Sequence, residues 1–251
     1  MVRILLTNDD GVGALGLQVL EEALADVGEI HVAAPLNEQS GTSRSITLRR
    51  PLRFEKKGVR RYAVEGTPAD TVMMAVNQIL DFRPDLVVSG INAGSNLGEN
   101  IYYSGTVAAA AEAAKYCIPA IALSVNARKN IDYSQAAELA PRIALQALET
   151  GMPAGVALNV NVPHPWKEGI EITRQSRKIS RKLMIEVLDP HGRPYYWMHE
   201  EVPLADAEPG SDYAAIRDGK VSITPIRFDH TEEMLIEPLR QSWERIMAPD
   251  L

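Results

Sequence analysis

Short apolar runs alternate with amphipathic segments over residues 1–165, and this alternation constrains the fold more than any other feature. An apolar run between turn residues is typical of a buried parallel strand, and an amphipathic segment is typical of a covering helix. Repeated strand–helix–strand units predict an α/β fold, a parallel sheet with helices on both faces. The expected strands are Arg3–Thr7, Ile30–Pro35, Leu86–Ser89, Ala120–Val125 and Val156–Val162, and the expected helices are Leu17–Val27, Pro68–Leu80, Thr106–Tyr116 and Tyr133–Thr150.

The pattern changes beyond Pro163. A strong turn signal over residues 188–195, between β-prone flanks, predicts a long β-hairpin. A short helix near 211–217, a strand over 221–225 and a closing helix over 231–247 complete the expected elements. We therefore divide the chain into a core, residues 1–165, and an extension, residues 166–251, that completes the same domain.

The expected hairpin is rich in large apolar side chains. Isolated two-stranded hairpins are marginally stable in water, so this one is expected to pack on another subunit. The sequence thus predicts a homo-oligomer. The alternative is that the hairpin folds back on its own sheet.

Composition excludes several classes of protein. A net charge of −7 argues against a polynucleotide partner, which requires a basic surface. The most apolar long stretch, residues 107–125, is interrupted by Glu112, Lys115 and Pro119, so no membrane segment is expected. A single cysteine, Cys117, and an acidic N-terminal stretch indicate the cytoplasm. We expect Cys117 and His31 to be core residues.

Two adjacent carboxylates follow the first expected strand, in Asn8-Asp9-Asp10-Gly11. Burying them ionised would cost several kcal/mol, so a hard divalent cation is expected beside them. Both can reach one ion only if the chain has left the strand, which Gly11 allows. Asp-Asp-Gly alone is more typical of an ordinary turn. Its place at the carboxyl end of a strand favours a ligand site, because open α/β sheets bind ligands there.

Two further loops leave the carboxyl ends of expected strands. The loop over 37–45 is rich in hydroxyls and contains Arg44, but such loops are mostly solvated connectors, and alone it predicts little. The loop over 89–98 is rich in Gly and Asn, and Asn92 could add a neutral amide oxygen to a carboxylate cage. The alternative for this loop is an irregular connection that uses Asn and Gly for left-handed turns.

The segment Ser104-Gly105-Thr106-Val107 begins the expected Ala-rich helix. Free N–H groups and the helix dipole form an anion site at such a helix start, and the two hydroxyls add donors for a phosphate. An ordinary Ser or Thr cap is the commoner reason for such residues. We favour the anion site because this helix follows the Asn/Gly loop closely.

Some motifs are absent from the sequence. Neither a Gly-Lys-Ser/Thr phosphate loop nor a dinucleotide-type Gly-x-Gly-x-x-Gly in the first strand–helix turn is present, which argues against a dinucleotide site and against an ATP-binding phosphate loop. The five histidines are scattered and Cys117 has no partner, so zinc is not expected. Oxygen ligands instead indicate Mg²⁺ or Mn²⁺.

Taken together, these segments resemble the SurE (survival protein E) family, in the same order and over nearly the whole chain. The matching segments are Asn8-Asp9-Asp10-Gly11, Ser40-Gly41, Gly66-Thr67-Pro68-Ala69-Asp70, residues 89–98, Tyr103-Ser104-Gly105-Thr106 and Val221-Ser222-Ile223-Thr224-Pro225. The resemblance implies a Rossmann-like core and an extended C-terminal hairpin exchanged between subunits, which gives dimers or tetramers.

The resemblance also implies a metal-dependent phosphatase, a 5′-nucleotidase that acts on nucleoside 5′- and 3′-monophosphates and sometimes on short polyphosphate. It implies one divalent cation per subunit. The implied metal ligands are Asp9, Asp10, Ser40 and Asn92; Asn96 and the Ser104-Gly105-Thr106 turn lie near the phosphate, and the expected catalytic residues are Asp9, Asp10, Asn96 and Ser104.

Two other functions stay open at this point. An aspartyl phosphotransferase of the haloacid dehalogenase type also begins with a strand and two Asp, but its Asp lie two residues apart, whereas Asp9 and Asp10 are adjacent. A non-catalytic nucleotide- and metal-binding stress sensor would use the same loops without hydrolysis.

Overall fold

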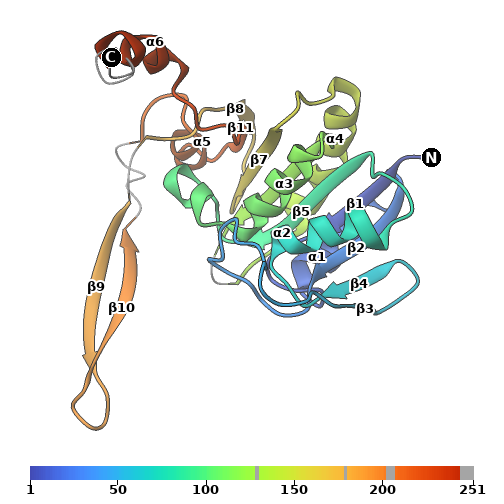
Figure 1. The fold of residues 1–251 in the computed structure, drawn as a ribbon, viewed down its shortest axis with the longest axis horizontal. Coiled ribbons are helices and arrows are strands. Elements are labelled where there is room, and N and C mark those ends of the chain that lie inside the picture. Colours follow the sequence, from blue (N-terminus) through green and yellow to red (C-terminus); the bar gives the residue numbers. More distant parts are fainter. Residues whose placement is uncertain (128–129, 178–179, 202–206, 244–251) are drawn as a thin grey trace, which may run out of the picture.

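A nine-stranded sheet forms the centre of the computed structural model, which describes residues 1–127, 130–177, 180–201 and 207–243 (Figure 1). The strand order is β3-β4-β2-β1-β5-β6-β7-β11-β8. From β4 to β7 neighbouring strands are parallel, whereas β3 is antiparallel to β4, and β11 to β7. The strands are β1 (Arg3–Thr7), β2 (Glu29–Pro35), β3 (Phe54–Lys56), β4 (Arg61–Val64), β5 (Leu86–Ala93), β6 (Ala120–Asn126), β7 (Val156–Pro163), β8 (Ile170–Ile172) and β11 (Val221–Arg227).

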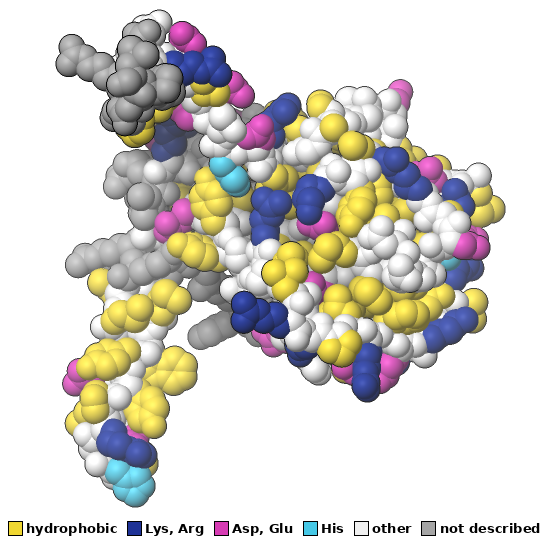
Figure 2. All heavy atoms as spheres, viewed as in Figure 1, with side chains coloured by type: hydrophobic (Ala, Val, Ile, Leu, Met, Phe, Trp, Pro, Cys, Tyr) yellow, Lys and Arg dark blue, Asp and Glu magenta, His cyan; other side chains and the backbone are white. Residues whose placement is uncertain are grey.

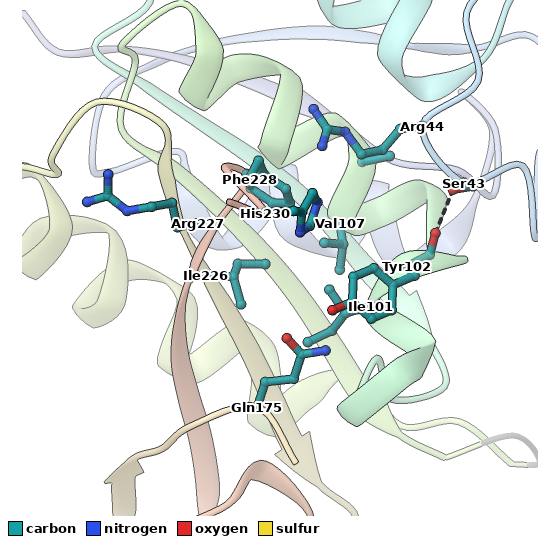
Figure 3. A pocket seen from close by; sticks show the side chains of 11 residues that line it. Ser43, Arg44, Ile101, Tyr102, Val107, Gln175, Ile226, Arg227, Phe228 and His230 are labelled. Atoms are coloured by element: carbon teal, nitrogen blue, oxygen red, sulfur yellow. Dashed lines mark hydrogen bonds between the residues drawn. The ribbon is translucent and has the colours of Figure 1, made fainter. Parts of the chain in front are cut away.

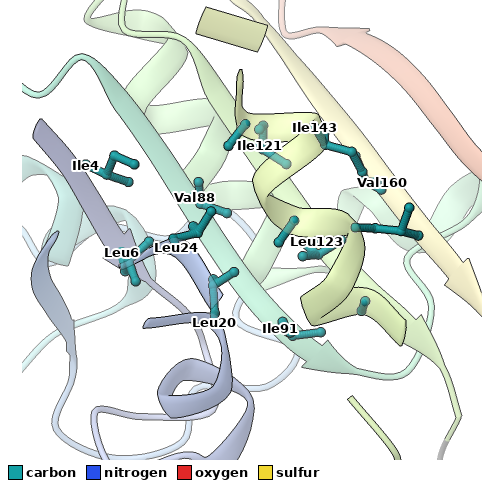
Figure 4. Packing of buried hydrophobic residues seen from close by; sticks show 14 of the residues in the cluster. Ile4, Leu6, Leu20, Leu24, Val88, Ile91, Ile121, Leu123, Ile143 and Val160 are labelled. Atoms are coloured by element: carbon teal, nitrogen blue, oxygen red, sulfur yellow. The ribbon is translucent and has the colours of Figure 1, made fainter. Parts of the chain in front are cut away.

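Helices cover both faces of this sheet, as predicted (Figure 1). On one face, α1 and α4 pack against Ile4, Leu6, Val88 and Leu123 (Figure 4). On the other face, α2 and α3 pack on the alternate strand residues, among them Leu5 and Val87. The helices are α1 (Leu15–Leu24), α2 (Pro68–Met74), the π-helical turn η1 (Ala75–Ile79), the 3₁₀ turn η2 (Gly98–Tyr102), α3 (Gly105–Lys115), α4 (Ser134–Thr150), α5 (Asp212–Arg217) and α6 (Glu233–Ser242).

All five predicted core strands and all four predicted core helices are present, with ends displaced by a few residues. Helix α2 begins with a capping box, in which Thr67 Oγ1 accepts from the Asp70 N–H and Asp70 Oδ2 accepts from the Thr67 N–H. The predicted helix over 68–80 is instead α2 followed by η1. The sequence analysis missed β3, β4 and β8, because strands of only three or four residues contain no long apolar run.

The predicted hairpin is present as β9 (Arg181–Leu188) and β10 (Pro194–Glu201), which form a separate antiparallel sheet. It extends away from the body of the molecule, so it does not fold back on its own sheet (Figure 1). Its apolar side chains are exposed, as the space-filling view shows (Figure 2), and they include Met184, Ile185, Tyr195, Tyr196, Trp197 and Met198. Packing on another subunit stays a prediction.

Three smaller predictions have mixed outcomes. The predicted closing helix over 231–247 begins later, at Glu233, and its last residues, 244–247, lie outside the described residues. His31 is buried, as predicted, but Cys117 is exposed, because it lies in the turn between α3 and β6 with a left-handed φ of 56°. Among the described helices, none combines the length and the apolar character needed to cross a bilayer.

Candidate active site

The strand order reverses between β1 and β5, since the chain proceeds from β1 to β2 on one side and from β5 to β6 and β7 on the other. Open α/β sheets bind ligands at the carboxyl ends of the strands beside such a switch point. A cavity of about 440 Å³ lies there. It is lined by Asp9, Ser40, Gly41, Asn92, Ala93, Gly94, Ser95, Asn96, Asn100, Tyr103 and Ser104.

After β1 the chain leaves the strand direction in a turn over residues 8–11. The Asn8 amide spans this turn: its Nδ2 donates to the Gly11 carbonyl at 3.0 Å and its Oδ1 accepts from the Gly11 N–H at 3.2 Å. Gly11 has a φ of 102°, a conformation that glycine adopts without strain. The Asp9 carbonyl accepts from the Gln39 N–H at 2.7 Å. The turn therefore also fixes the start of the loop that carries Ser40.

The Asp9 carboxylate lies against the start of α3. It is 5% exposed, and the Thr106 hydroxyl donates to its Oδ1 at 2.5 Å. Burial raises the pKa of Asp9 above its ordinary value, although the hydrogen bond from Thr106 acts in the opposite direction. Thr106 is fully buried, so its side chain orients Asp9. The backbone N–H of Thr106 also forms a hydrogen bond with the Asp9 carboxylate, and it too acts to lower the pKa of Asp9.

Gly105 makes this close approach possible. A Cβ atom at this position would lie 2.7 Å from the Asp9 Cβ and 3.0 Å from the Pro68 Cγ. Both distances are shorter than an ordinary van der Waals contact. Only glycine therefore allows the first turn of α3 to contact the carboxylate without a shift of either element.

Asp10 does not line the cavity. Partial burial, and then the charges of Asp9 and Glu38, raise the pKa of Asp10 to about 6. Its charge in turn helps to raise the pKa of Tyr133, whose partial burial is the larger cause. Among the described residues, no Lys, Arg or His forms an ion pair with Asp9 or Asp10. Two neighbouring carboxylates that are shielded from water and have no cationic partner repel each other. A bound metal ion would therefore lower the free energy of the folded protein.

Asn92 and Ser40 supply neutral oxygens to the same cavity. The Asn92 Nδ2 donates to the Gly94 carbonyl at 2.7 Å, which fixes the side chain and leaves its Oδ1 as an acceptor. The Ser40 hydroxyl donates to Glu38 Oε1 at 2.8 Å, so its lone pairs stay available. In the part of the chain that the structure describes, no cluster of three His, Cys, Asp or Glu suits a metal ion. A cation here would depend on hydroxyl and amide oxygens as well as carboxylates.

Asn96 is held from below by buried polar side chains. Its Nδ2 donates to Ser124 Oγ at 2.9 Å, and its backbone N–H donates to Asn161 Oδ1 at 2.8 Å. Its carbonyl accepts from Asn159 Nδ2 at 2.7 Å and from Asn161 Nδ2 at 3.2 Å. The sequence analysis missed these two asparagines. The available sequence signal was the presence of two amides at alternate positions of an otherwise apolar strand. The structure shows that both are fully buried.

The C-terminal part of the chain also contacts the loop after β5, at Gly98. Asp212, fully buried at the start of α5, accepts from the Gly98 N–H at 2.8 Å and from the Ser176 N–H at 3.0 Å. Gln175 Nε2 donates to the Gly98 carbonyl at 2.8 Å. Gln175 and Asp212 therefore help to position the loop, although they lie outside the predicted core.

Ser104 begins α3 as its N-cap, since its Oγ accepts from the Val107 N–H at 3.1 Å. It is 7% exposed and lines the cavity together with Tyr103. The helix start thus points toward the cavity that also contains Asp9 and Asn92, which favours the binding of an anion there.

Comparison with known proteins agrees with this geometry. The family model described as "Survival protein SurE" matches residues 4–182, which include every residue of the cavity. The chain belongs to the SurE family. The match covers all of the loops that follow β1, β2 and β5.

Individual SurE proteins are similar over nearly their whole length. The 5′-nucleotidase SurE of Geotalea daltonii is 44% identical over 248 residues, which cover 97% of this chain and 99% of that protein. The 5′-nucleotidase SurE of Myxococcus xanthus is 46% identical over 238 residues, 92% of this chain and 89% of that protein. The crystal structure of SurE from Aquifex aeolicus superposes with a TM-score of 0.86 at 39% identity, and the alignment covers 96% of this chain and 99% of that one.

Proposed function

We propose that this protein is a metal-dependent 5′-nucleotidase, which hydrolyses nucleoside 5′-monophosphates to nucleoside and phosphate. The observation that carries the proposal is the arrangement of Asp9 against the start of α3, beside Asn92, in one cavity at the switch point. Membership of the SurE family, with relatives named 5′-nucleotidase at 44% and 46% identity, supports hydrolysis over a sensor without catalysis.

We further propose that Asp9, Asp10, Ser40 and Asn92 hold one divalent cation, Mg²⁺ or Mn²⁺. Their oxygen atoms are the donors that these hard cations prefer. A bound cation would neutralise the two carboxylates and polarise a phosphate oxygen. Asp10 lies at the edge of this set rather than on the cavity wall, so its share of the coordination is the point most in need of a test.

The chain's own groups account for the remaining steps. The start of α3, with Ser104, Gly105 and Thr106, and the side chain of Asn96 would donate hydrogen bonds to the phosphate oxygens. A water molecule attacks phosphorus, the bond from phosphorus to the ester oxygen breaks, and that oxygen gains a proton as the nucleoside leaves. Asp9 and Asp10 are the two carboxylates that could take the proton of the water.

A second route uses an Asp as the nucleophile. In that case an aspartyl phosphate forms and is then hydrolysed. Acid quench after a few milliseconds with ³²P-labelled nucleotide separates the routes, because the second leaves label on the protein. Labelled protein would exclude direct attack by water.

The central experiment measures phosphate release from purified protein with 5′-AMP and 5′-GMP, in Mn²⁺ or Mg²⁺, with and without EDTA. We expect release that EDTA abolishes and that added metal restores. Binding of nucleotide without release in either metal would refute the enzyme and favour the sensor.

The assembly is part of the proposal. The exposed apolar side chains of the hairpin support a homodimer or homotetramer in which β9 and β10 pack on a second copy. Light scattering after size exclusion tests this, with Trp197→Ser and Tyr195→Ser together as the variant. A monomeric wild-type protein at micromolar concentration would refute it.

A further inference from the structure

The connection between β2 and β3, residues 36–53, contains no helix or strand. Connections of this length without regular structure are uncommon in a compact domain, and they usually carry a function. The first part of this one supplies Ser40 to the proposed metal site. No step proposed above uses the residues that follow Gly41 in it.

Basic residues are concentrated from residue 44 of this connection to residue 61 in β4, which we call the basic segment. It contains eight of the chain's 26 Lys and Arg but only one of its 33 Asp and Glu. The eight are Arg44, Arg49, Arg50, Arg53, Lys56, Lys57, Arg60 and Arg61, and all except Arg61 are exposed. The net charge of −7 therefore conceals an uneven distribution of charge along the chain.

Only part of the positive charge is neutralised within the fold. Three of the eight side chains form ion pairs: Lys57 with Glu55, Arg60 with Glu29 and Arg61 with Glu21. Four others form no ion pair with any described residue: Arg49, Arg50, Arg53 and Lys56. An exposed guanidinium without a carboxylate partner is the group that binds phosphate through two parallel hydrogen bonds.

Hydrogen bonds hold this part of the chain against the body of the molecule. Just before the basic segment, Ser43 Oγ donates to the Tyr102 carbonyl at 2.5 Å (Figure 3). Within it, the N–H and the hydroxyl of Thr47 both donate to the Asp70 carboxylate, at 2.9 Å and 2.6 Å. The backbone that carries the arginines is therefore fixed on the start of α2. A polyanion that binds here has less chain to order, which lowers the cost of binding.

The basic segment begins four residues after Ser40, which lines the Asp9 cavity. Gln39, the residue before Ser40, lines a separate cavity of about 260 Å³ together with Arg50. The lining of this cavity includes one carboxylate, Glu65, but it forms no ion pair with Arg50. An unpaired cation thus lies on the other side of the same loop from the proposed phosphate site.

An exposed aromatic ring lies among the basic side chains. Phe54 on β3 is 43% exposed, and its ring lies 6.1 Å from that of Tyr62 on β4, at an interplanar angle of 69°. Cations that contact the backbone and rings that stack on bases are typical of surfaces for single-stranded nucleic acid. A membrane-binding surface would require one continuous apolar face. The most exposed apolar side chains here, Leu48 and Val59, lie instead in two different loops.

We propose that the basic segment binds the phosphodiester backbone of a short single-stranded oligonucleotide whose terminal phosphate occupies the Asp9 cavity. The inference rests on the proposed function, because it extends the substrate of the same site beyond mononucleotides. Water attacks the terminal phosphorus, the bond from phosphorus to the ester oxygen breaks, and the products are phosphate and an oligonucleotide with a free hydroxyl. The few unpaired cations limit the contact to a few phosphates, so the acidic remainder of the chain does not exclude it.

The test compares 5′-AMP with two 5′-phosphorylated tetraadenylates, one with phosphodiester linkages and one with uncharged methylphosphonate linkages. In the wild type, kcat/KM should be about tenfold higher for the charged tetranucleotide than for the uncharged one. Arg49→Gln with Arg53→Gln should remove most of this difference and change kcat/KM for 5′-AMP by less than twofold. For the charged tetranucleotide, the slope of log kcat/KM against log salt concentration should become shallower by about 1.4, or about 0.7 for each lost contact.

Arg142→Gln with Arg240→Gln is the matched control, because it removes two exposed charges from α4 and α6. This variant should behave as the wild type with all three substrates. An equal loss in the control would overturn the proposal, since the charge of the whole protein would then be responsible.

The remaining outcomes separate the alternatives. Equal kcat/KM for the two tetranucleotides in the wild type would overturn the proposal, because the backbone charge would then have no effect. Binding to phosphatidylserine vesicles that is lost in Arg49→Gln with Arg53→Gln, without any difference between the tetranucleotides, would overturn it in favour of a membrane surface. Phosphate release from 5′-AMP but from neither tetranucleotide would overturn this inference alone. No release from any of the three substrates would instead refute the proposed function.

Discussion

The side chain of Asp10 should destabilise the metal-free protein at neutral pH, and Asp10→Asn should remove that cost. Burial and the charges of Asp9 and Glu38 raise the pKa of Asp10 from 3.8 to about 6. The folded protein therefore retains this proton at pH values where the unfolded chain has lost it. Stability falls as pH rises between these two values, because the folded state binds more protons there.

The size of the effect follows from the same two values. A displacement of one pH unit in a pKa is worth 1.36 kcal/mol, so a change from 3.8 to about 6 corresponds to about 3 kcal/mol. Asp10 is only partly buried, and screening by water reduces this, so we expect about 2 kcal/mol. The cost is absent below pH 3.8 and fully present above about pH 6.

Urea unfolding of EDTA-treated protein at pH 4 and pH 7 measures the difference. The difference in free energy of unfolding between Asp10→Asn and the wild type should be about 2 kcal/mol larger, in favour of the variant, at pH 7 than at pH 4. Other carboxylates titrate in both proteins, so their contributions cancel. Asp26→Asn, at an exposed position in the segment after α1, is the matched control and should show no such gain.

At pH 7, Mn²⁺ should make the wild type more stable than Asp10→Asn, the reverse of their order in EDTA. The wild type binds the ion in its folded state and gains about 2.7 kcal/mol at a concentration 100 times Kd, whereas the variant gains less. A constant difference between the wild type and Asp10→Asn at both pH values would refute the electrostatic argument. An equal gain from Mn²⁺ in both proteins would remove Asp10 from the metal site.

Three further substitutions test the supports of the site. Gly105→Ala should lower kcat for 5′-AMP at least a hundredfold, because the added Cβ lies 2.7 Å from the Asp9 Cβ and displaces the carboxylate or the helix; a kcat within threefold of the wild type would contradict this. Thr106→Val leaves the buried Asp9 carboxylate without this hydrogen bond and should lower kcat/KM about tenfold and the free energy of unfolding by about 1 to 3 kcal/mol; unchanged kinetics would show that the bond is not needed. Asn161→Ala leaves buried Asn96 groups without two hydrogen bonds and should cost about 2 to 3 kcal/mol in urea unfolding; a loss under 0.5 kcal/mol would exclude a supporting role.

The sequence predicted the elements whose signals are local. The apolar run before Asp9 specifies β1, and the Thr67 capping box starts α2. Both depend on residues within a few positions of one another, so the sequence alone suffices. Helix α1 shows the opposite case: its N-cap, Ala14, has no side-chain hydrogen bond, and the prediction placed its start two residues late.

Tertiary contacts explain what the sequence could not show. Thr106 has a hydroxyl that suits a phosphate, but in the fold it faces Asp9, which lies 97 positions away in the chain. Asp212 and Gly98 are 114 positions apart. No spacing rule connects such pairs, because a parallel sheet brings together loops that are separated by whole strand–helix units.

The polar residues of β6 and β7 explain why the loop after β5, which carries Asn96, is held in a single conformation. Ser124, Asn159 and Asn161 lie on the sheet face covered by α3, at positions that alternate with those facing α4. Apolar side chains there would give a more ordinary core, since burying an amide costs free energy unless it is hydrogen-bonded. Hydrogen bonds to Asn96 offset part of that cost, although the buried Oδ1 of Asn159 has no partner among the described residues, and these bonds form only when the loop lies in this one place. The sheet thus fixes the Asn96 side of the cavity through the polar side chains that interrupt its apolar face.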